Sequence, residues 1–318
     1  MPGGTSTSNP DPADNSPTPE RPPSKLRRPS ARPPSKADLL RYLRQLTLRD
    51  HELLEWLAEH YLLSTAQIAT ALFPSERSAL LRLATLHRIG AVHRFSDVRA
   101  GTGQHLYTLG PLGLVVHPHP YSDPAHPDAR PTRTSVERAH RIIGSGRLRH
   151  LLGTNQLFID LHAYTRTDPS ARLLRWWSEQ HATTAYAVAG IHPDGHGIWH
   201  AAGRTVGFFL EHDNGTENLR TVLRKLRAYE RLTEFGPRYP VLLRVPNHRR
   251  EAHLLDALAG VPTAMPVATG LHHEHPAGPA WTLTSDPGPR RWLHELPSDH
   301  GPDTATNPHR YTDPDDFP

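Results

Sequence analysis

The residues in this chain whose types and spacing suggest chemistry are two acidic segments and one isolated lysine. Asp194 forms the first segment, and Glu211 and Asp213 form the second. Lys225 follows them, and it is one of only three lysines in a chain that otherwise uses arginine for its basic positions. Carboxylates beside an ammonium group are suited to holding a metal ion and to stabilising charge during phosphodiester cleavage.

A β-hairpin is predicted to position these carboxylates. The segment Gly197–Asp213 has two apolar arms around Ala202-Gly203, which is the expected two-residue turn because glycine tolerates a positive φ. A turn centred there pairs Asp194 directly with Glu211, with Cβ atoms about 5 Å apart. Strand alternation then places four side chains on one face: His192, Asp194, Glu211 and Asp213.

Carboxylates this close repel one another, so they either take up a proton or bind a cation. Oxygen ligands in a partly open site suit Mg²⁺ or Mn²⁺. The predicted metal ligands are Asp194, Glu211 and Asp213, with Lys225 close enough to stabilise the charge that builds during cleavage.

Two alternatives to that metal site stay open. The carboxylates are merely solvated strand ends in the first, and Lys225 is then an ordinary surface residue. Zinc is the second, although the chain has no cysteine and shows no familiar zinc spacing. The zinc ligands would be the histidines of the same region: His192, His196, His200 and His212.

The element that follows the hairpin must bring the lysine to the carboxylates. Residues 217–232 have the apolar spacing of a helix, and Thr216 is its expected N-cap. Lys225 and Tyr229 are four residues apart, so they share one flank of this helix. They border its buried stripe, and Lys225 is therefore expected to reach the acidic segments.

Composition narrows the class of protein. A chain of 318 residues is long enough for two domains, and the absence of cysteine excludes disulfides. No apolar run approaches the roughly 20 residues of a membrane span, and the N-terminus lacks the apolar segment of a signal peptide. We therefore expect a cytoplasmic protein without membrane contact. The net charge of +4, with arginine gathered early and aspartate late, is compatible with a nucleic-acid partner.

Composition also divides the chain into five segments. Residues 1–37 and 297–318 are expected to be disordered tails, the first basic and the second acidic. Residues 117–135 are rich in proline and are expected to be a linker. They separate a first folded unit at 38–116 from a second at 136–296.

The first unit is expected to be a winged helix-turn-helix. Helices are predicted at 50–61 and 65–72 and from 75 to 90, and strands at 91–95 and 105–109. In that architecture the third helix enters the major groove of double-stranded DNA, beside a wing formed by the two strands. The expected DNA contacts are the arginines of these elements: Arg77, Arg82, Arg88, Arg94 and Arg99. The alternative is a winged helix used for protein contact or as a homodimer.

The second unit is expected to be an α/β domain around a central mixed sheet. Helical segments are predicted between 137 and 165, then a short helix or turn at 171–181 and a strand near 184–188. After the hairpin and the 217–232 helix, strands are predicted at 240–245, 263–268 and 281–284, with a helix at 248–259. The pair Trp176-Trp177 could stack on bases, but such pairs more often cover a core.

From about residue 45 to residue 260 the chain resembles the replication-relaxation family of actinobacterial plasmids and integrative elements. The resemblance rests on the order of short pieces ending in Lys225 and Tyr229: Leu46–Asp50, Leu62–Ile68, Arg82–Leu86, Tyr107–Gly113, Pro193–Gly195 and Phe209–Glu217. It implies a DNA-associated protein of plasmid replication or mobilisation, with other replication or transfer proteins as partners.

The second unit separately resembles the PD-(D/E)xK nuclease superfamily, whose α/β fold is that of restriction endonucleases. Asp194 matches its first acidic motif and Glu211 its second, but Asp213 stands where that superfamily has its catalytic lysine. Lys225 and Tyr229 occupy the place of a Gln-x-x-x-Tyr motif on the next helix of exonuclease-like relatives, which implies catalytic roles for Asp194, Glu211 and Lys225. Two functions stay open: a metal-dependent DNA nickase, and a non-enzymatic transcription or replication accessory factor with a degenerate nuclease fold.

Overall fold

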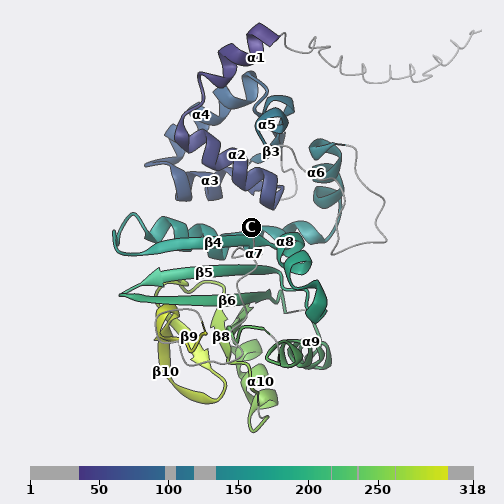
Figure 1. Cartoon of the computed structure of the whole chain (residues 1–318), viewed down its shortest axis with the longest axis vertical. Coiled ribbons are helices and arrows are strands. Elements are labelled where there is room, and N and C mark those ends of the chain that lie inside the picture. The colour runs from purple at the N-terminus through teal and green to yellow at the C-terminus, as the bar shows by residue number, and fades with distance from the viewer. Residues whose placement is uncertain are drawn as a thin grey trace, which may run out of the picture.

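The computed structural model describes residues 36–96, 105–117, 134–215, 217–234, 236–261 and 263–299. Arg99 and the rest of the expected wing loop lie outside these ranges, as do most of the expected tails and linker. Within them the chain forms two packed parts, a helical part above a sheet-based part (Figure 1). The described helices are all too short or too polar to cross a membrane.

The N-terminal part gathers helices around a small sheet whose strand order is β1-β3-β2. Local sequence sets the start of its main helices, because Thr47, Ser64 and Ser75 each accept a hydrogen bond from the first helical turn. The expected helices and strands are present, joined by two short helices and a two-residue strand. Its elements are α1 (Lys36–Leu43), α2 (Leu48–His60), β1 (Leu63–Ser64), α3 (Thr65–Leu72), α4 (Glu76–Arg88), β2 (Val92–Ser96), β3 (His105–Leu109) and α5 (Pro111–Val116).

The C-terminal part is built on one seven-stranded sheet with the order β10-β9-β8-β7-β6-β5-β4. The pairs β6–β7 and β7–β8 are parallel and the other pairs are antiparallel, so the expected mixed sheet is confirmed. Its strands are β4 (Arg172–Ser178), β5 (Gly195–Ala201), β6 (Arg204–His212), β7 (Val241–Val245), β8 (Val267–Leu271), β9 (Pro279–Leu283) and β10 (Asp286–Trp292).

Helices cover both faces of this sheet. On one face, α9 (Leu219–Leu232) and α10 (His248–Leu258) pack on residues such as Phe209 and Leu243. On the other face, α7 (Arg147–Tyr164) packs on Phe208 and Leu242. The alternation of side chains along β6 and β7 therefore supplies two separate cores, as expected for a sheet buried on both sides.

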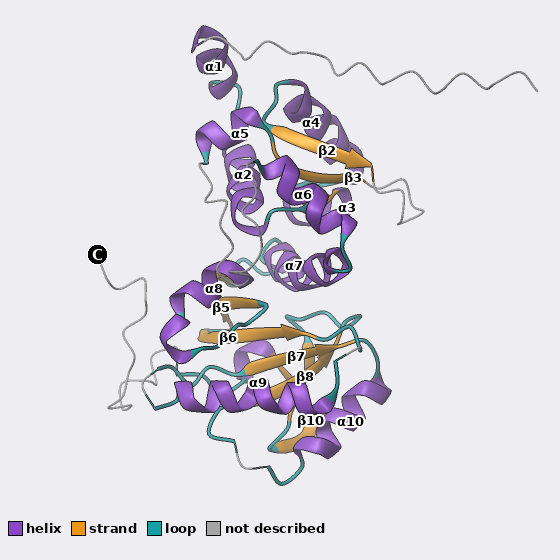
Figure 2. Cartoon of the chain, turned by 90° about the vertical axis from the view of Figure 1, so that its right-hand side faces the viewer, coloured by secondary structure: helices purple, strands orange, loops and turns teal. Residues whose placement is uncertain are grey.

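Helix α7 also joins the two parts, because it lies between the sheet and α3 (Figure 2). Its Ile159 belongs to the N-terminal core, and the Asn155 amide donates to the Leu62 carbonyl at 3.2 Å. The Gln67 amide donates in the opposite direction, to the Leu152 carbonyl at 2.8 Å. The preceding helix, α6 (Ser135–Gly144), packs on the β2–β3 strands.

Two expectations for the C-terminal part are wrong. Residues 171–181 were expected to be a helix or turn but form strand β4 and the start of α8 (Glu179–Ala185). The strand expected near 184–188 is absent, because these residues belong to α8 and to a short 3-10 helix (Ala187–Ala189). Ser178 ends the strand and caps α8, which places the change of element between the tryptophan pair and the polar residues. Smaller differences are the N-cap of α9, which is Asn218, and the later start of β8.

Candidate functional site

The predicted hairpin register is confirmed and brings the first acidic residue to the second. Strands β5 and β6 pair from Ala201–Arg204 back to Gly195–Leu210, around a turn in which Ala202 and Gly203 have φ of 50° and 74°. Both positive values are those of a tight hairpin turn. The ladder extends one step further, because the Asp194 amide donates to the Leu210 carbonyl at 2.9 Å. Asp194 therefore lies across from Glu211.

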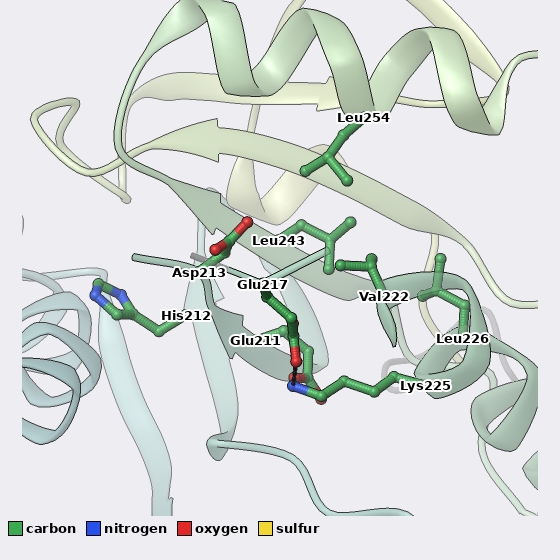
Figure 3. Close-up of a pocket in the computed structure, with 9 residues that line it drawn as sticks. All are labelled: Glu211, His212, Asp213, Glu217, Val222, Lys225, Leu226, Leu243 and Leu254. Atoms are coloured by element: carbon green, nitrogen blue, oxygen red, sulfur yellow. Dashed lines mark hydrogen bonds and ion pairs between the residues drawn. The ribbon is translucent and has the colours of Figure 1, made fainter. Parts of the chain in front are cut away.

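Glu211 is buried, with 5 % of its surface exposed, and both of its oxygens are engaged by helix α9. The Lys225 ammonium donates to Oε2 at 2.8 Å, and the Tyr229 hydroxyl donates to Oε1 at 2.7 Å. Lys225 also reaches Glu217 Oε1 at 3.1 Å (Figure 3). The spacing of Lys225 and Tyr229 on one helix flank thus brings both side chains to a single carboxylate.

Asp194 is held by groups from the opposite side. His150 Nε2, from α7, lies 3.0 Å from Oδ1, and the His212 backbone amide donates to Oδ2 at 2.7 Å. Burial alone would raise the pKa of Asp194, but the hydrogen bond and charge of His150, together with the charge of Lys225, hold it below its usual range. His150 was missed by the sequence analysis, because it lies on a distant helix and only the packing of α7 on the sheet brings it here.

The two carboxylates have opposite pKa shifts. Burial and then the negative charge of Asp194 raise the pKa of Glu211 to about 7, against the opposing effects of Lys225 and Tyr229. Burial would lower the pKa of Lys225, but the charges of Glu211 and Asp194 outweigh it and raise that pKa, so the ammonium persists at neutral pH. The centre is a carboxylate, a second carboxylate that titrates near neutrality, and a permanent cation.

Asp213 does not join this centre, so the expected set of three carboxylate ligands is not assembled. Its Oδ2 lies 2.6 Å from Arg250 Nε, and its Oδ1 accepts from the Gly215 amide at 2.6 Å. Figure 3 shows its side chain apart from Glu211 and Lys225. Among the residues that the structure describes, no three His, Cys, Asp or Glu side chains are grouped as metal ligands.

The histidines proposed as zinc ligands are also dispersed. His196 is buried, with Nδ1 2.8 Å from the Phe208 carbonyl, while His200 Nδ1 lies 2.8 Å from the Thr205 hydroxyl at the far end of the hairpin. His212 stacks on His272, on the α7 face of the sheet. The zinc alternative is therefore not supported by these positions.

A surface hollow of ≈ 380 Å³ opens beside Glu211, and we call it the Glu211 hollow. One side is formed by Gly190, Ile191 and His192, and the other is formed by α9, with Arg224, Lys225, Arg227, Ala228, Tyr229 and Arg231. Glu211 and its two α9 partners thus face a space whose α9 wall carries four basic side chains.

The tryptophan pair belongs to the core rather than to a base-stacking surface. Trp177 is buried and Trp176 stacks on His60 with ring centroids 3.8 Å apart and on Phe158 at 5.3 Å. Because His60 comes from α2, Trp176 packs at the junction between the two parts.

The arginines expected to contact DNA fall into two groups. Arg77 and Arg88 are exposed on α4, and Arg94 is exposed on β2. Arg82 is instead turned inward: its Nε donates to buried Asp50 at 2.9 Å, and another nitrogen donates to the Gln45 carbonyl at 2.9 Å. We therefore assign Arg82 to the stability of the N-terminal part and remove it from the candidate contacts.

Fold and site together define an α+β protein with a carboxylate–lysine centre at the strand ends of a mixed sheet. The family model described as Replication-relaxation matches residues 54–242, which is more than half of the chain. The chain therefore belongs to the replication-relaxation family. The match begins within α2 and covers the rest of the N-terminal part, the hairpin and all of α9. No curated protein and no solved structure matches this chain.

Proposed function

We propose that this protein binds double-stranded DNA in plasmid replication or mobilisation, and that the Asp194–Glu211–Lys225 centre cleaves one strand with the help of a divalent metal. The observation that carries the proposal is Glu211 itself. It is buried at a strand end, opposite a second carboxylate, bonded to an ammonium and open to the Glu211 hollow. Family membership associates the chain with plasmid replication or relaxation.

The order of elements supports the resemblance to PD-(D/E)xK nucleases. Helix α7, the antiparallel strands β4-β5-β6, helix α9 and the parallel strand β7 occur in this order, with α7 and α9 on opposite faces of the sheet. Helix α8 and a short 3-10 helix are inserted between β4 and β5. Asp194 precedes the second strand of this series and Glu211 lies near the end of the third. Lys225 replaces the missing lysine of the second motif by reaching Glu211 from the next helix.

The donor set fits Mg²⁺ or Mn²⁺ with two protein ligands. Mg²⁺ is commonly held by one or two carboxylates together with water and substrate phosphate oxygens, so a third carboxylate is not needed. Asp194 and Glu211 would be these ligands, because burial and then the negative charge of Asp194 raise the pKa of Glu211, and a bound cation would relieve the repulsion between the two carboxylates. A bound ion would polarise the phosphate and activate water.

The chain's own residues have distinct roles in this proposal. Lys225 remains cationic and stabilises the charge that develops on the phosphate. Tyr229 fixes one oxygen of Glu211, and His150 fixes one oxygen of Asp194, so both carboxylates are held in one orientation. Asp213 and Arg250 lie outside the centre, where their ion pair ties the loop after β6 to α10.

In the N-terminal part, the proposed contact with double-stranded DNA is the exposed face of α4. Arg77 and Arg88 lie on that face, and neither makes an ion pair with any described residue. Three helices followed by two antiparallel strands are the elements of a winged helix-turn-helix, in which the third helix contacts the major groove.

A nicking assay tests the catalytic proposal. Supercoiled plasmid is incubated with and without Mg²⁺ or Mn²⁺ and with three proteins: the wild type, Glu211→Gln and Asp213→Asn. The last is a matched control, because it makes the same carboxylate-to-amide change outside the centre. We expect metal-dependent nicked circles from the wild type and from Asp213→Asn, and none from Glu211→Gln. Intact plasmid with an equal gel shift for all three would leave a DNA-binding protein without nuclease activity.

A second candidate function, protein contact by the N-terminal part, is favoured by exposed leucines on the same helix. Leu81 is 65 % exposed and Leu80 is 40 % exposed on α4, and Leu40 is 59 % exposed on α1. Surfaces of this kind are typical of self-association, including a homodimer. Light scattering after gel filtration distinguishes the two: a dimer converted to a monomer by Leu81→Gln would assign α4 to protein contact.

A further inference from the structure

The outer face of α9 carries a stripe of arginines that the proposed chemistry does not use. Arg220, Arg224, Arg227 and Arg231 are separated by four, three and four positions, so they lie on one side of the helix. All four are exposed, while Val222, Leu226 and Tyr229 pack inward. We call these four residues the α9 stripe.

The stripe is not neutralised by the acidic residues near it. Within α9 the acidic residue is Glu230, and its carboxylate accepts from the Ala264 and Met265 backbone amides at 3.0 and 3.3 Å. Glu217, just before the helix, is paired with Lys225. None of the four arginines forms an ion pair with a described residue. The face therefore presents four uncompensated positive charges to solvent.

The stripe is also continuous with the candidate site. Arg224, Arg227 and Arg231 line the Glu211 hollow together with Lys225 and Tyr229, and Arg220 extends the line by one turn. Arginines that only keep a protein soluble can lie anywhere on its surface. Arginines that bind a nucleic acid acted on by the centre must lie next to Glu211, as these do.

We infer that the α9 stripe binds the phosphate backbone of the DNA strand that the Asp194–Glu211–Lys225 centre acts on. This inference rests on the proposed function and adds the path of the strand. From Arg220 to Arg231 the helix rises about 16 Å, which is about the axial rise of five nucleotides in one strand of B-DNA. Arginine suits this contact because its guanidinium binds phosphate through two parallel hydrogen bonds.

Salt-dependent DNA binding in EDTA tests the inference without requiring cleavage. The probe is a fluorescein-labelled, mixed-sequence duplex of thirty base pairs, and its labelled single strand is a second probe. The test variant is Arg224→Gln/Arg227→Gln. The matched control is Arg172→Gln/Arg204→Gln, which removes the same charge from two exposed positions. Arg172 and Arg204 are the first residues of β4 and β6, whereas Glu211 lies near the last residue of β6.

Each phosphate contact contributes about 0.9 to the slope of log affinity against log salt for duplex DNA. We therefore expect the α9 variant to lose nearly two units of slope and roughly 10- to 100-fold in duplex affinity near 0.1 M salt. The control should keep the wild-type slope. Equal slopes for the α9 variant and the control would overturn the inference. A deficit seen only with the single strand would assign the stripe to an unwound strand.

A cross-linking measurement gives an independent readout, because the natural chain has no cysteine. Arg227→Cys should capture a duplex that carries a mixed disulfide tethered to its backbone, because the cysteine thiolate attacks the disulfide and releases the capping thiol, whereas Arg204→Cys should not. Equal capture at both positions would refute the stripe. A wild-type protein that binds neither probe would refute DNA binding as a whole. Normal binding by Arg224→Gln/Arg227→Gln with metal-dependent nicking intact would refute the stripe and leave the proposed function standing.

Discussion

Replacing Tyr229 by phenylalanine removes one atom from the centre and has a consequence that depends on pH. The Tyr229 hydroxyl is buried and donates to Glu211 Oε1 at 2.7 Å. Phenylalanine keeps the ring that packs on Phe209 but removes the α9 donor to Glu211 Oε1. Lys225 still donates to the other oxygen, Oε2. The substitution therefore isolates the hydrogen bond from the packing.

The magnitude follows from the charge on Glu211. A hydrogen bond to a charged group contributes about 1.5–3 kcal/mol, so we expect Tyr229→Phe to lower the free energy of unfolding by about 2 kcal/mol at pH 8.5. Burial and the charge of Asp194 raise the pKa of Glu211 to about 7, so the carboxyl is largely protonated at pH 5.5. Since the bond then joins neutral groups, the loss should fall to about 1 kcal/mol. Losing the Tyr229 donor raises the folded-state pKa of Glu211 still further above its unfolded value. The loss in the free energy of unfolding therefore grows as the pH rises.

A double-mutant cycle measured by urea unfolding separates this bond from other effects. Tyr229→Phe combined with Glu211→Gln should cost at least 1 kcal/mol less at pH 8.5 than the sum of the single changes. The control pairs Tyr229→Phe with Glu251→Gln, another buried carboxylate, which lies on α10 and is bonded to Thr269 of β8 and Arg290 of β10. That pair should be additive. Additivity in both cycles, or a cost independent of pH, would refute the reasoning.

Three further changes test the surroundings of the site. Arg82→Ala leaves a buried aspartate without its cation and should cost about 2 kcal/mol in urea unfolding, while DNA affinity at low temperature stays unchanged. Burial would raise the pKa of Glu59, but the hydrogen bond from His181 lowers that pKa to about 2. The ionised Glu59 therefore stabilises the folded state fully above its ordinary pKa of 4.5, and this stabilisation is lost as the pH falls toward 2. Glu59→Gln should therefore cost on the order of 2 kcal/mol at pH 7, and the difference should shrink below pH 4 in the same assay. A Cβ on Gly153 would lie 2.2 Å from the His212 ring, so Gly153→Ala should lower the melting temperature, whereas Gly144→Ala, with nothing within 4 Å, should not.

The hairpin was predictable because its register depends on local residues alone. A two-residue turn at Ala202-Gly203 fixes every pair along the ladder, so the position of Asp194 opposite Glu211 followed from counting. The reach of Lys225 and Tyr229 followed in the same way, from helical spacing and the narrow apolar stripe of α9. Caps at Ser64 and Ser75 likewise located α3 and α4.

What sequence reasoning missed depends on residues far apart in the chain. His150 and Arg250 have no local signal for their carboxylate partners, and each reaches its partner only because a helix packs on the sheet. The error at 171–181 has a similar cause. Strand β4 does not alternate cleanly between apolar and polar residues, since Trp176 packs against the N-terminal part while Trp177 faces the sheet's own core. Its strand character comes from pairing with β5.

The packing of α7 ties the proposed DNA contact to the proposed site of cleavage. Helix α4 packs on α3, α3 packs on α7, and α7 carries His150 against Asp194. Asn155 and Ile159 of the same helix are anchored in the N-terminal part, so α7 cannot shift relative to α3 without breaking buried contacts. A chain in which two domains were connected only by a linker would let bound DNA sample many positions over the carboxylates. If α4 binds DNA as proposed, the packing of α7 would keep that DNA in a fixed relation to Asp194 and Glu211, and the α9 stripe would need to guide the strand only across the sheet-based part.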